Sequence, residues 1–177
     1  MTTMVLTVIG DDRAGLIEAL ASVIAGAGGN WDESHMAELG GKFAGVVLVT
    51  VAADRASELT AALEPLEERG LLDITVTTAN DGPALSGRRF GLELVGHDQP
   101  GIVREISSAM AGLNVSIEEL RTETKEAPHA GGTLFSAVAQ LVAPAGVEMD
   151  QIRSELEDLS NQLMVDIELS SQAATGA

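Results

Sequence analysis

The chain has 177 residues and a formal net charge of −17, from 27 acidic and 10 basic side chains. Nucleic-acid binding relies on Lys and Arg to displace phosphate counterions, so this balance argues against direct contact with DNA or RNA and favours a basic protein partner. The absence of cysteine excludes disulfides, thiolate metal sites and cysteine nucleophiles. Without a signal peptide or a membrane-spanning apolar run, we expect a cytoplasmic location and no contact with membranes.

The first half of the chain alternates short apolar runs with amphipathic stretches. These patterns predict, in chain order, a strand at 4–9, a helix ending near Ala27, strands at 30–39 and 43–52, a helix at 56–69 and a strand at 72–78. Gly28 tolerates the left-handed conformation that ends a helix, and we expect Asn114 to do the same in the second half. Trp31 opens a predicted strand and is expected to pack in the core.

The second half repeats the first after a shift of 86 residues, which makes seven of 24 positions identical between 10–33 and 96–119. It predicts strands at 90–95, 115–124, 133–142 and 163–170, with helices ending near Leu113 and spanning 149–161. Each half then reads βαββαβ, the ferredoxin-like order of an antiparallel sheet with both helices on one face, and the fold class is α+β. We expect domains at 1–80 and 88–170, a linker at 81–87 and a disordered tail at 171–177.

The turn between the first strand and first helix of each half carries the pattern Asp-x-x-Gly. Asp12 and Asp98 are predicted to cap the helices by accepting a backbone N–H. Gly15 and Gly101, expected in the first helical turn, suggest that a ligand or a facing domain approaches the backbone there. The N–H groups of a helix start suit the carboxylate of an amino acid. The same pattern also begins many helices that bind nothing, so both readings stay open.

These turns, Gly-Asp-Asp-Arg-Ala-Gly-Leu-Ile from residue 10 and Gly-His-Asp-Gln-Pro-Gly-Ile-Val from residue 96, resemble the first-loop motif of ACT domains. The block from Asn30-Trp31 to Phe43-Ala44-Gly45 resembles, more narrowly, the glycine cleavage system transcriptional repressor family. This resemblance implies a non-enzymatic tandem ACT protein that responds to an amino acid, with glycine and serine as candidates, and that acts through a DNA-binding regulator. It implies as ligand-binding residues Asp12, Arg13, Gly15, Asn30, His97, Asp98, Gln99, Pro100, Gly101 and Asn114.

The first loop departs from the ACT motif at Ala14, where proline is usual, and is therefore expected to be less rigid than the second loop with its Pro100. An alternative function is a ligand-free ACT pair that serves as an assembly or regulatory subunit of a metabolic enzyme. An enzyme is disfavoured, because the three histidines have no nucleophile or acid placed beside them by spacing. We expect no cofactor and no metal, and we expect a homo-oligomer, most simply a dimer, because small sheets leave edges open.

Overall fold

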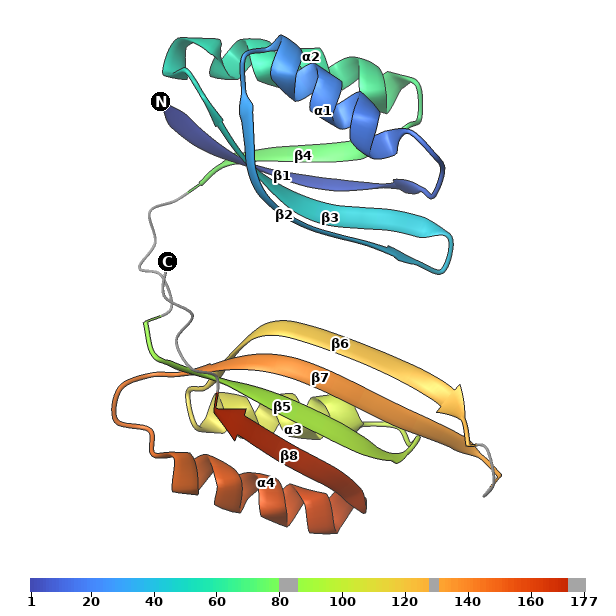
Figure 1. The fold of residues 1–177 in the computed structure, drawn as a ribbon, viewed down its shortest axis with the longest axis vertical. Coiled ribbons are helices and arrows are strands. Elements are labelled where there is room, and N and C mark those ends of the chain that lie inside the picture. Colours follow the sequence, from blue (N-terminus) through green and yellow to red (C-terminus); the bar gives the residue numbers. More distant parts are fainter. Residues whose placement is uncertain (80–85, 128–130, 172–177) are drawn as a thin grey trace. The chain divides into compact units, whose positions relative to one another are not determined.

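The computed structural model of the protein describes residues 1–79, 86–127 and 131–171. The chain divides into two compact units, Met1–Asp81 and Gly82–Ala177. Each unit is one four-stranded antiparallel sheet with two helices on one face, as Figure 1 shows. The α+β ferredoxin-like fold predicted from the sequence is therefore confirmed for both halves. Most of the expected linker and the expected tail lie outside the described residues, so their character stays a prediction.

In its described residues, 1–79, unit 1 consists of four strands, two α-helices and one short 3-10 helix. They are β1 (Thr2–Asp11), α1 (Leu16–Gly26), β2 (Asn30–Leu39), β3 (Lys42–Val51), η1 (Ala53–Arg55), α2 (Ala56–Glu68) and β4 (Asp73–Thr78). The strand order in the sheet is β2-β3-β1-β4. The first strand of the chain is thus central and pairs with both β3 and β4.

Unit 2 repeats this topology in the order β6-β7-β5-β8. Its elements are β5 (Arg88–His97), α3 (Ile102–Gly112), β6 (Ser116–Glu126), β7 (Thr133–Ala143), α4 (Met149–Leu163) and β8 (Val165–Ser171). The edge strands β2 and β6 both carry a β-bulge, at Asp32 and at Glu118, just after they begin. The two bulges lie at corresponding positions, so the repeat extends to this irregularity.

The core of each unit lies between its sheet and its helices. Alternate residues of a strand face the same side, and in β1 these are the buried Met4, Leu6 and Val8. The helices contribute residues at spacings of three and four, as an amphipathic helix does, and the buried set in α1 and α3 is Leu16, Leu20, Ile24, Ile102, Ile106 and Met110. Trp31 is half-buried and packs against the core of unit 1, as predicted.

The helix starts differ from the prediction. Asp12 and Asp98 do not cap α1 and α3, because these helices begin only at Leu16 and Ile102. The N-cap residues are instead Gly15 and Gly101, and neither helix has a side-chain cap hydrogen bond. The predicted helix ends are confirmed: Gly28 and Asn114 adopt positive φ angles of 71° and 54°. No helix in the described part of the chain is long and apolar enough to cross a membrane.

Candidate functional site in the strand-to-helix loops

The loop between β1 and α1 is held at two points. The backbone N–H of Asp12 donates to the carbonyl of Gly41, at 2.9 Å, in the turn between β2 and β3. The guanidinium of Arg13 donates to the carbonyl of Gly70, just after α2. The loop is therefore tied to the β2–β3 turn and to the end of α2, and Arg13 is already engaged in a structural contact.

The loop between β5 and α3 is held in the same way by different residues. The N–H of Asp98 donates to the carbonyl of Thr133, at 2.8 Å, at the start of β7. The side-chain amide of Gln99 donates to the carbonyl of Leu163, at 2.6 Å, at the end of α4. Gln99 follows Asp98 as Arg13 follows Asp12, so the two side chains share one anchoring role despite their different chemistry.

Gly15 and Gly101 are required by backbone conformation. Their φ angles are 94° and 100°, a region that residues with a Cβ rarely adopt. A Cβ built at either position would meet nothing within 4 Å. The repeated glycine is thus explained by the helix start, and no close approach of another group is needed to account for it. The expected approach of a ligand at these glycines has to be argued from other features.

A hollow lies at the start of α1, at the loop that the sequence singled out. Its volume is about 480 Å³, it is open to solvent, and its lining consists of Asp12, Arg13, Ala14, Gly15, Leu16, Ile17, Glu18 and Phe43. Phe43 comes from β3, where it pairs with Gly10, and Phe135 pairs with Gly96 in unit 2. Sequence reasoning missed Phe43 as a site residue, although the recurrence of a phenylalanine at the same position of both halves was a usable signal.

The hollow combines exposed backbone donors with carboxylates. The first N–H groups of α1 lack a side-chain cap, and the positive end of the helix dipole lies there. Asp12 and Glu18 add negative charge to the lining. Beside the loop, Asp11 forms an ion pair with Lys42, and the hydrogen bond and charge of Lys42 lower the pKa of the Asp11 carboxyl. Such a site offers partners to both ends of a zwitterion.

The remaining candidates do not all gather at these loops. Asn30 pairs with Thr50, at the opposite end of the sheet from Asp12. Thr50 lies eight residues along β3 from Lys42, which pairs with Asp11, and this separation corresponds to roughly 26 Å. Asn114 likewise precedes β6 at the end remote from Asp98. His97 is exposed at the end of β5, next to Asp98. Within each unit the structure brings the loop residues together and leaves the asparagine apart.

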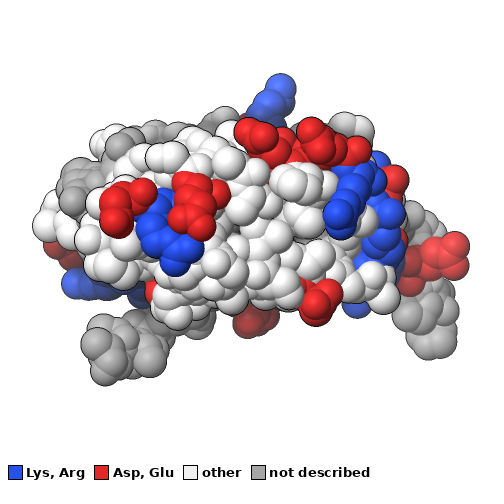
Figure 2. All heavy atoms as spheres, turned by 90° about the horizontal axis from the view of Figure 1, so that it is seen from above, with Lys and Arg blue, Asp and Glu red and all other residues white. Residues whose placement is uncertain are grey.

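Basic side chains are neutralised locally. Seven of the ten Lys and Arg residues form ion pairs with carboxylates: Lys42, Arg55, Arg89, Arg104, Arg121, Lys125 and Arg153. On the face drawn in Figure 2, most basic side chains lie beside acidic ones, and a broad area carries no charge. Among the described residues, no group of three or more His, Asp or Glu is placed to hold a metal ion.

Comparison with known proteins agrees with this architecture. A family model of the ACT domain matches residues 2–77, which lie within unit 1. The crystal structure of an unknown protein from Galdieria sulphuraria is 30% identical, covers 97% of this chain and 99% of that one, and superposes with a TM-score of 0.86. Residues 2–77 belong to the ACT-domain family. No curated protein matches the chain.

A second solved structure extends the likeness in fold to the tandem arrangement. A "putative glycine cleavage system transcriptional repressor" is 17% identical, covers 96% of each chain and has a TM-score of 0.71. At this identity the likeness concerns the fold. It supports the predicted fold of two tandem ferredoxin-like modules.

Proposed function

We propose that this tandem ACT-domain protein is a non-enzymatic regulator that binds a small amino acid at the β1–α1 loop. The observation that carries the proposal is the hollow at the uncapped start of α1. The ACT family and the repressor-like neighbour support a regulatory role over a catalytic one.

The hollow suits a zwitterion for three reasons. The carboxylate of an amino acid accepts hydrogen bonds from the free N–H groups of the first turn of α1. Its ammonium group finds a counter-charge at Asp12, which lines the hollow. Phe43 and Ile17 supply an apolar wall for a short side chain. Arg13 is not needed as a carboxylate ligand, because it binds the Gly70 carbonyl.

A ligand at this loop would change the surface that a partner meets. The loop is bonded to the β2–β3 turn and to the end of α2, so ordering it orders three segments together. With a net charge of −17, the chain favours a basic partner. The sequence resemblance makes a DNA-binding transcription regulator the first partner to test and glycine and serine the first ligands. The cytoplasm remains the expected location.

The test is thermal unfolding against a panel of amino acids at millimolar concentration. Trp31 is the single tryptophan and packs in the core of unit 1, so its emission follows the unit that contains the hollow. A ligand at 100 times its dissociation constant stabilises the folded state by about 2.7 kcal/mol. We expect one amino acid to raise the melting temperature selectively, and Asp12→Asn to abolish this rise.

Asp98→Asn, the same change in the loop of unit 2, is the matched control and should leave the Trp31 response intact. Both variants should melt like the parent protein without ligand, because the backbone N–H of each residue makes the structural bond. Stabilisation that survives in Asp12→Asn would refute the proposed site.

Two observations favour the alternative, a ligand-free subunit that assembles with or regulates a metabolic enzyme. Arg13 and Gln99, both expected to contact ligand, donate to backbone carbonyls. Gly15 and Gly101 are explained by their φ angles alone. A panel in which no amino acid shifts the melting temperature would favour this alternative, and affinity capture of a defined enzyme partner would then be required to support it.

A further inference from the structure

The third residue of the first helix carries opposite charge in the two units. It is Glu18 in α1 and Arg104 in α3, each three positions after the glycine that is the N-cap. The rest of the two helix starts corresponds: an aspartate held by its backbone N–H, a left-handed glycine, and an apolar residue, Ile17 or Val103, before the charged one. The sign of this charge is therefore a difference within a conserved local geometry.

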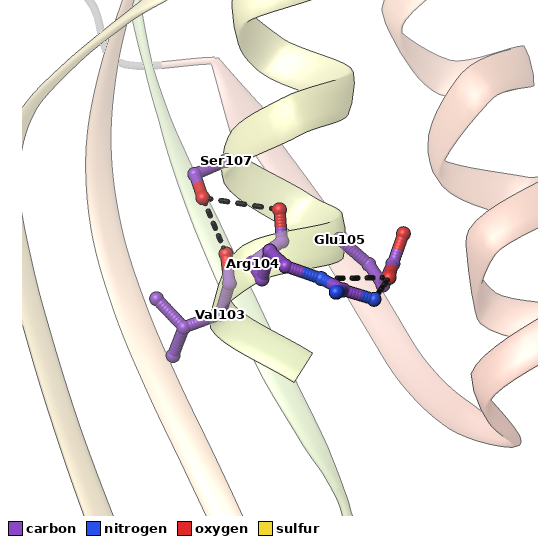
Figure 3. Close-up of polar contacts among 4 residues, drawn as sticks. All are labelled: Val103, Arg104, Glu105 and Ser107. Atoms are coloured by element: carbon purple, nitrogen blue, oxygen red, sulfur yellow. Dashed lines mark hydrogen bonds and ion pairs between the residues drawn. The ribbon is translucent and has the colours of Figure 1, made fainter. Parts of the chain in front are cut away.

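The helix start does not depend on the acid. The positive end of a helix dipole favours a carboxylate in the first turn and disfavours a guanidinium. α3 nevertheless begins in the same conformation as α1, although Arg104 stands in its first turn. Figure 3 shows that Arg104 turns sideways to the carboxylate of Glu105 and forms an ion pair with it. Since the helix forms with either charge, its start does not fix the sign at Glu18.

Glu18 lines the hollow at the β1–α1 loop. Its carboxylate accepts a hydrogen bond from Ser22 Oγ, at 3.2 Å, one turn further along α1. It belongs to none of the ion pairs formed by the described residues. The cations near the loop are engaged elsewhere, Arg13 with a backbone carbonyl and Lys42 with a carboxylate of β1. The charge of Glu18 therefore acts on whatever occupies the hollow.

In the binding mode proposed above, both charged ends of an amino acid already have partners. The first N–H groups of α1 hold its carboxylate, and Asp12 holds its ammonium group. The side chain is then left to the remaining lining, which includes Ile17, Phe43 and Glu18. A side chain that ends in a carboxylate meets a like charge there. An amide of the same shape instead offers N–H donors to Glu18, which is a favourable charge-assisted hydrogen bond.

We propose that Glu18 sets the charge selectivity of the β1–α1 site, which accepts small amino acids whose side chain carries no negative charge and excludes aspartate and glutamate. This inference rests on the proposed function of the hollow and names the class of ligand that it takes. Two like charges about 4 Å apart in water repel enough to weaken binding about fivefold, and partial removal of water strengthens the effect.

The test uses two pairs of amino acids that match in shape and differ in charge, asparagine with aspartate and glutamine with glutamate. Dissociation constants for the full chain come from the thermal midpoint, read by Trp31 emission, as a function of amino-acid concentration. The parent protein should bind each amide at least about fivefold more tightly than its acid. Glu18→Gln should bring the two constants of a pair together, and Glu18→Arg should reverse their order.

The matched control is Arg104→Glu, the reverse exchange in unit 2, which should leave the preference read by Trp31 unchanged. Each variant is compared with its own midpoint without ligand, because a charge at the start of a helix also changes its stability. Ionic strength is kept equal within a pair. Raising the salt to about 1 M should narrow the difference in the parent, because charges are then screened beyond about 3 Å.

The outcomes separate this inference from the proposed function. If no amino acid shifts the midpoint, the proposed function fails and the role of Glu18 fails with it. If the parent binds amide and acid equally, or if its preference survives in Glu18→Gln, amino acids bind but Glu18 does not select among them. If glycine or serine binds and neither asparagine nor aspartate does, the site selects by size, which also overturns the inference.

Discussion

The two units share one topology but fill the space beside their first helix differently. In unit 1, Trp31, Met36 and Val47 pack there, and Met36 lies so close over Gly45 that a Cβ on this glycine would come within 2.6 Å of its Cγ. The same register positions of unit 2 hold Ile117, Thr122 and Ala139. In unit 2 an apolar groove lies between α3 and β6, with Val103, Leu120 and Phe135 in its lining.

This difference separates what fixes the fold from what is free to diverge. Both units keep the alternation of buried residues in their central strands, the glycine that starts the helix and the bulge at the edge. They differ in volume at the edge of the core, where a side chain touches solvent on one side. The space beside the first helix is therefore filled in unit 1 and left as an open apolar groove in unit 2.

The largest expected change in stability comes from exchanging Val47 and Ala139, which occupy corresponding positions beside the first helix of each unit. Val47→Ala should lower the stability of unit 1 by about 2 kcal/mol, because Val47 is fully buried and its removal leaves a cavity. The reverse change, Ala139→Val, should stabilise unit 2 by up to about 1 kcal/mol as it fills the groove. Urea unfolding followed by Trp31 emission measures the first, and hydrogen exchange of β7 amides measures the second. A loss of stability in Ala139→Val would show that the groove cannot accept more volume.

The loop anchors provide a smaller contrast. Gln99→Ala should lower the stability of unit 2 by about 1 kcal/mol, since it leaves the partly buried carbonyl of Leu163 without its donor. Arg13→Ala should cost unit 1 less, because Arg13 is exposed and water can replace its bond to Gly70. Hydrogen exchange at the starts of α3 and α1 compares the two. Equal losses would mean that the exposure of the anchor does not matter.

The helix ends give a third comparison. The residue with positive φ that ends the second helix is Gly70 in unit 1, at 60°, and Met164 in unit 2, at 53°. Met164 is 80% exposed, so Met164→Gly removes backbone strain and loses little packing. It should stabilise unit 2 by about 0.5 kcal/mol after the added freedom of the unfolded chain is counted. Urea midpoints by circular dichroism measure this, and an unchanged or lower midpoint would indicate that Met164 makes a stabilising contact.

The smallest expected effect concerns pH and the ion pair at the bulge of β6. Arg89 forks onto Glu118 through two hydrogen bonds of 2.9 and 3.0 Å and lowers the pKa of that carboxyl. A lowered folded-state pKa contributes stability above the ordinary glutamate pKa and loses it as the pH falls through the lowered value. Because both side chains reach solvent, water screens the pair and this contribution is small. Glu118→Gln should be less stable than the parent near pH 7, and this difference should disappear as the pH falls below the lowered pKa of Glu118. A difference that persists in strong acid would rule out the ion pair as its cause.

The sequence was sufficient to predict the topology, because the same order of apolar runs and amphipathic stretches occurs in both halves. The sequence was less informative at the helix starts, because the spacing predicts Asp12 as the N-cap of α1. In the structure the backbone N–H of Asp12 donates to the β2–β3 turn, and the left-handed Gly15 is the N-cap of the helix. The sequence also grouped Asn30 with the loop, although a strand of this length carries it to the far end of the sheet. Phe43 and the groove residues depend on pairing register and side-chain volume, which composition and periodicity do not encode.

The central position of β1 determines when each unit can be completed. β1 pairs with β3 and with β4, so the first residues of the chain complete their pairing only when residues near 78 are available. Such long sequence separations slow folding, because loop-closure entropy is lost before the contacts form. All pairings of unit 1 nevertheless lie within the first 78 residues, before β5 begins. During synthesis unit 1 can therefore close its sheet before β5, whose pattern resembles that of β1, emerges to compete for the same neighbours.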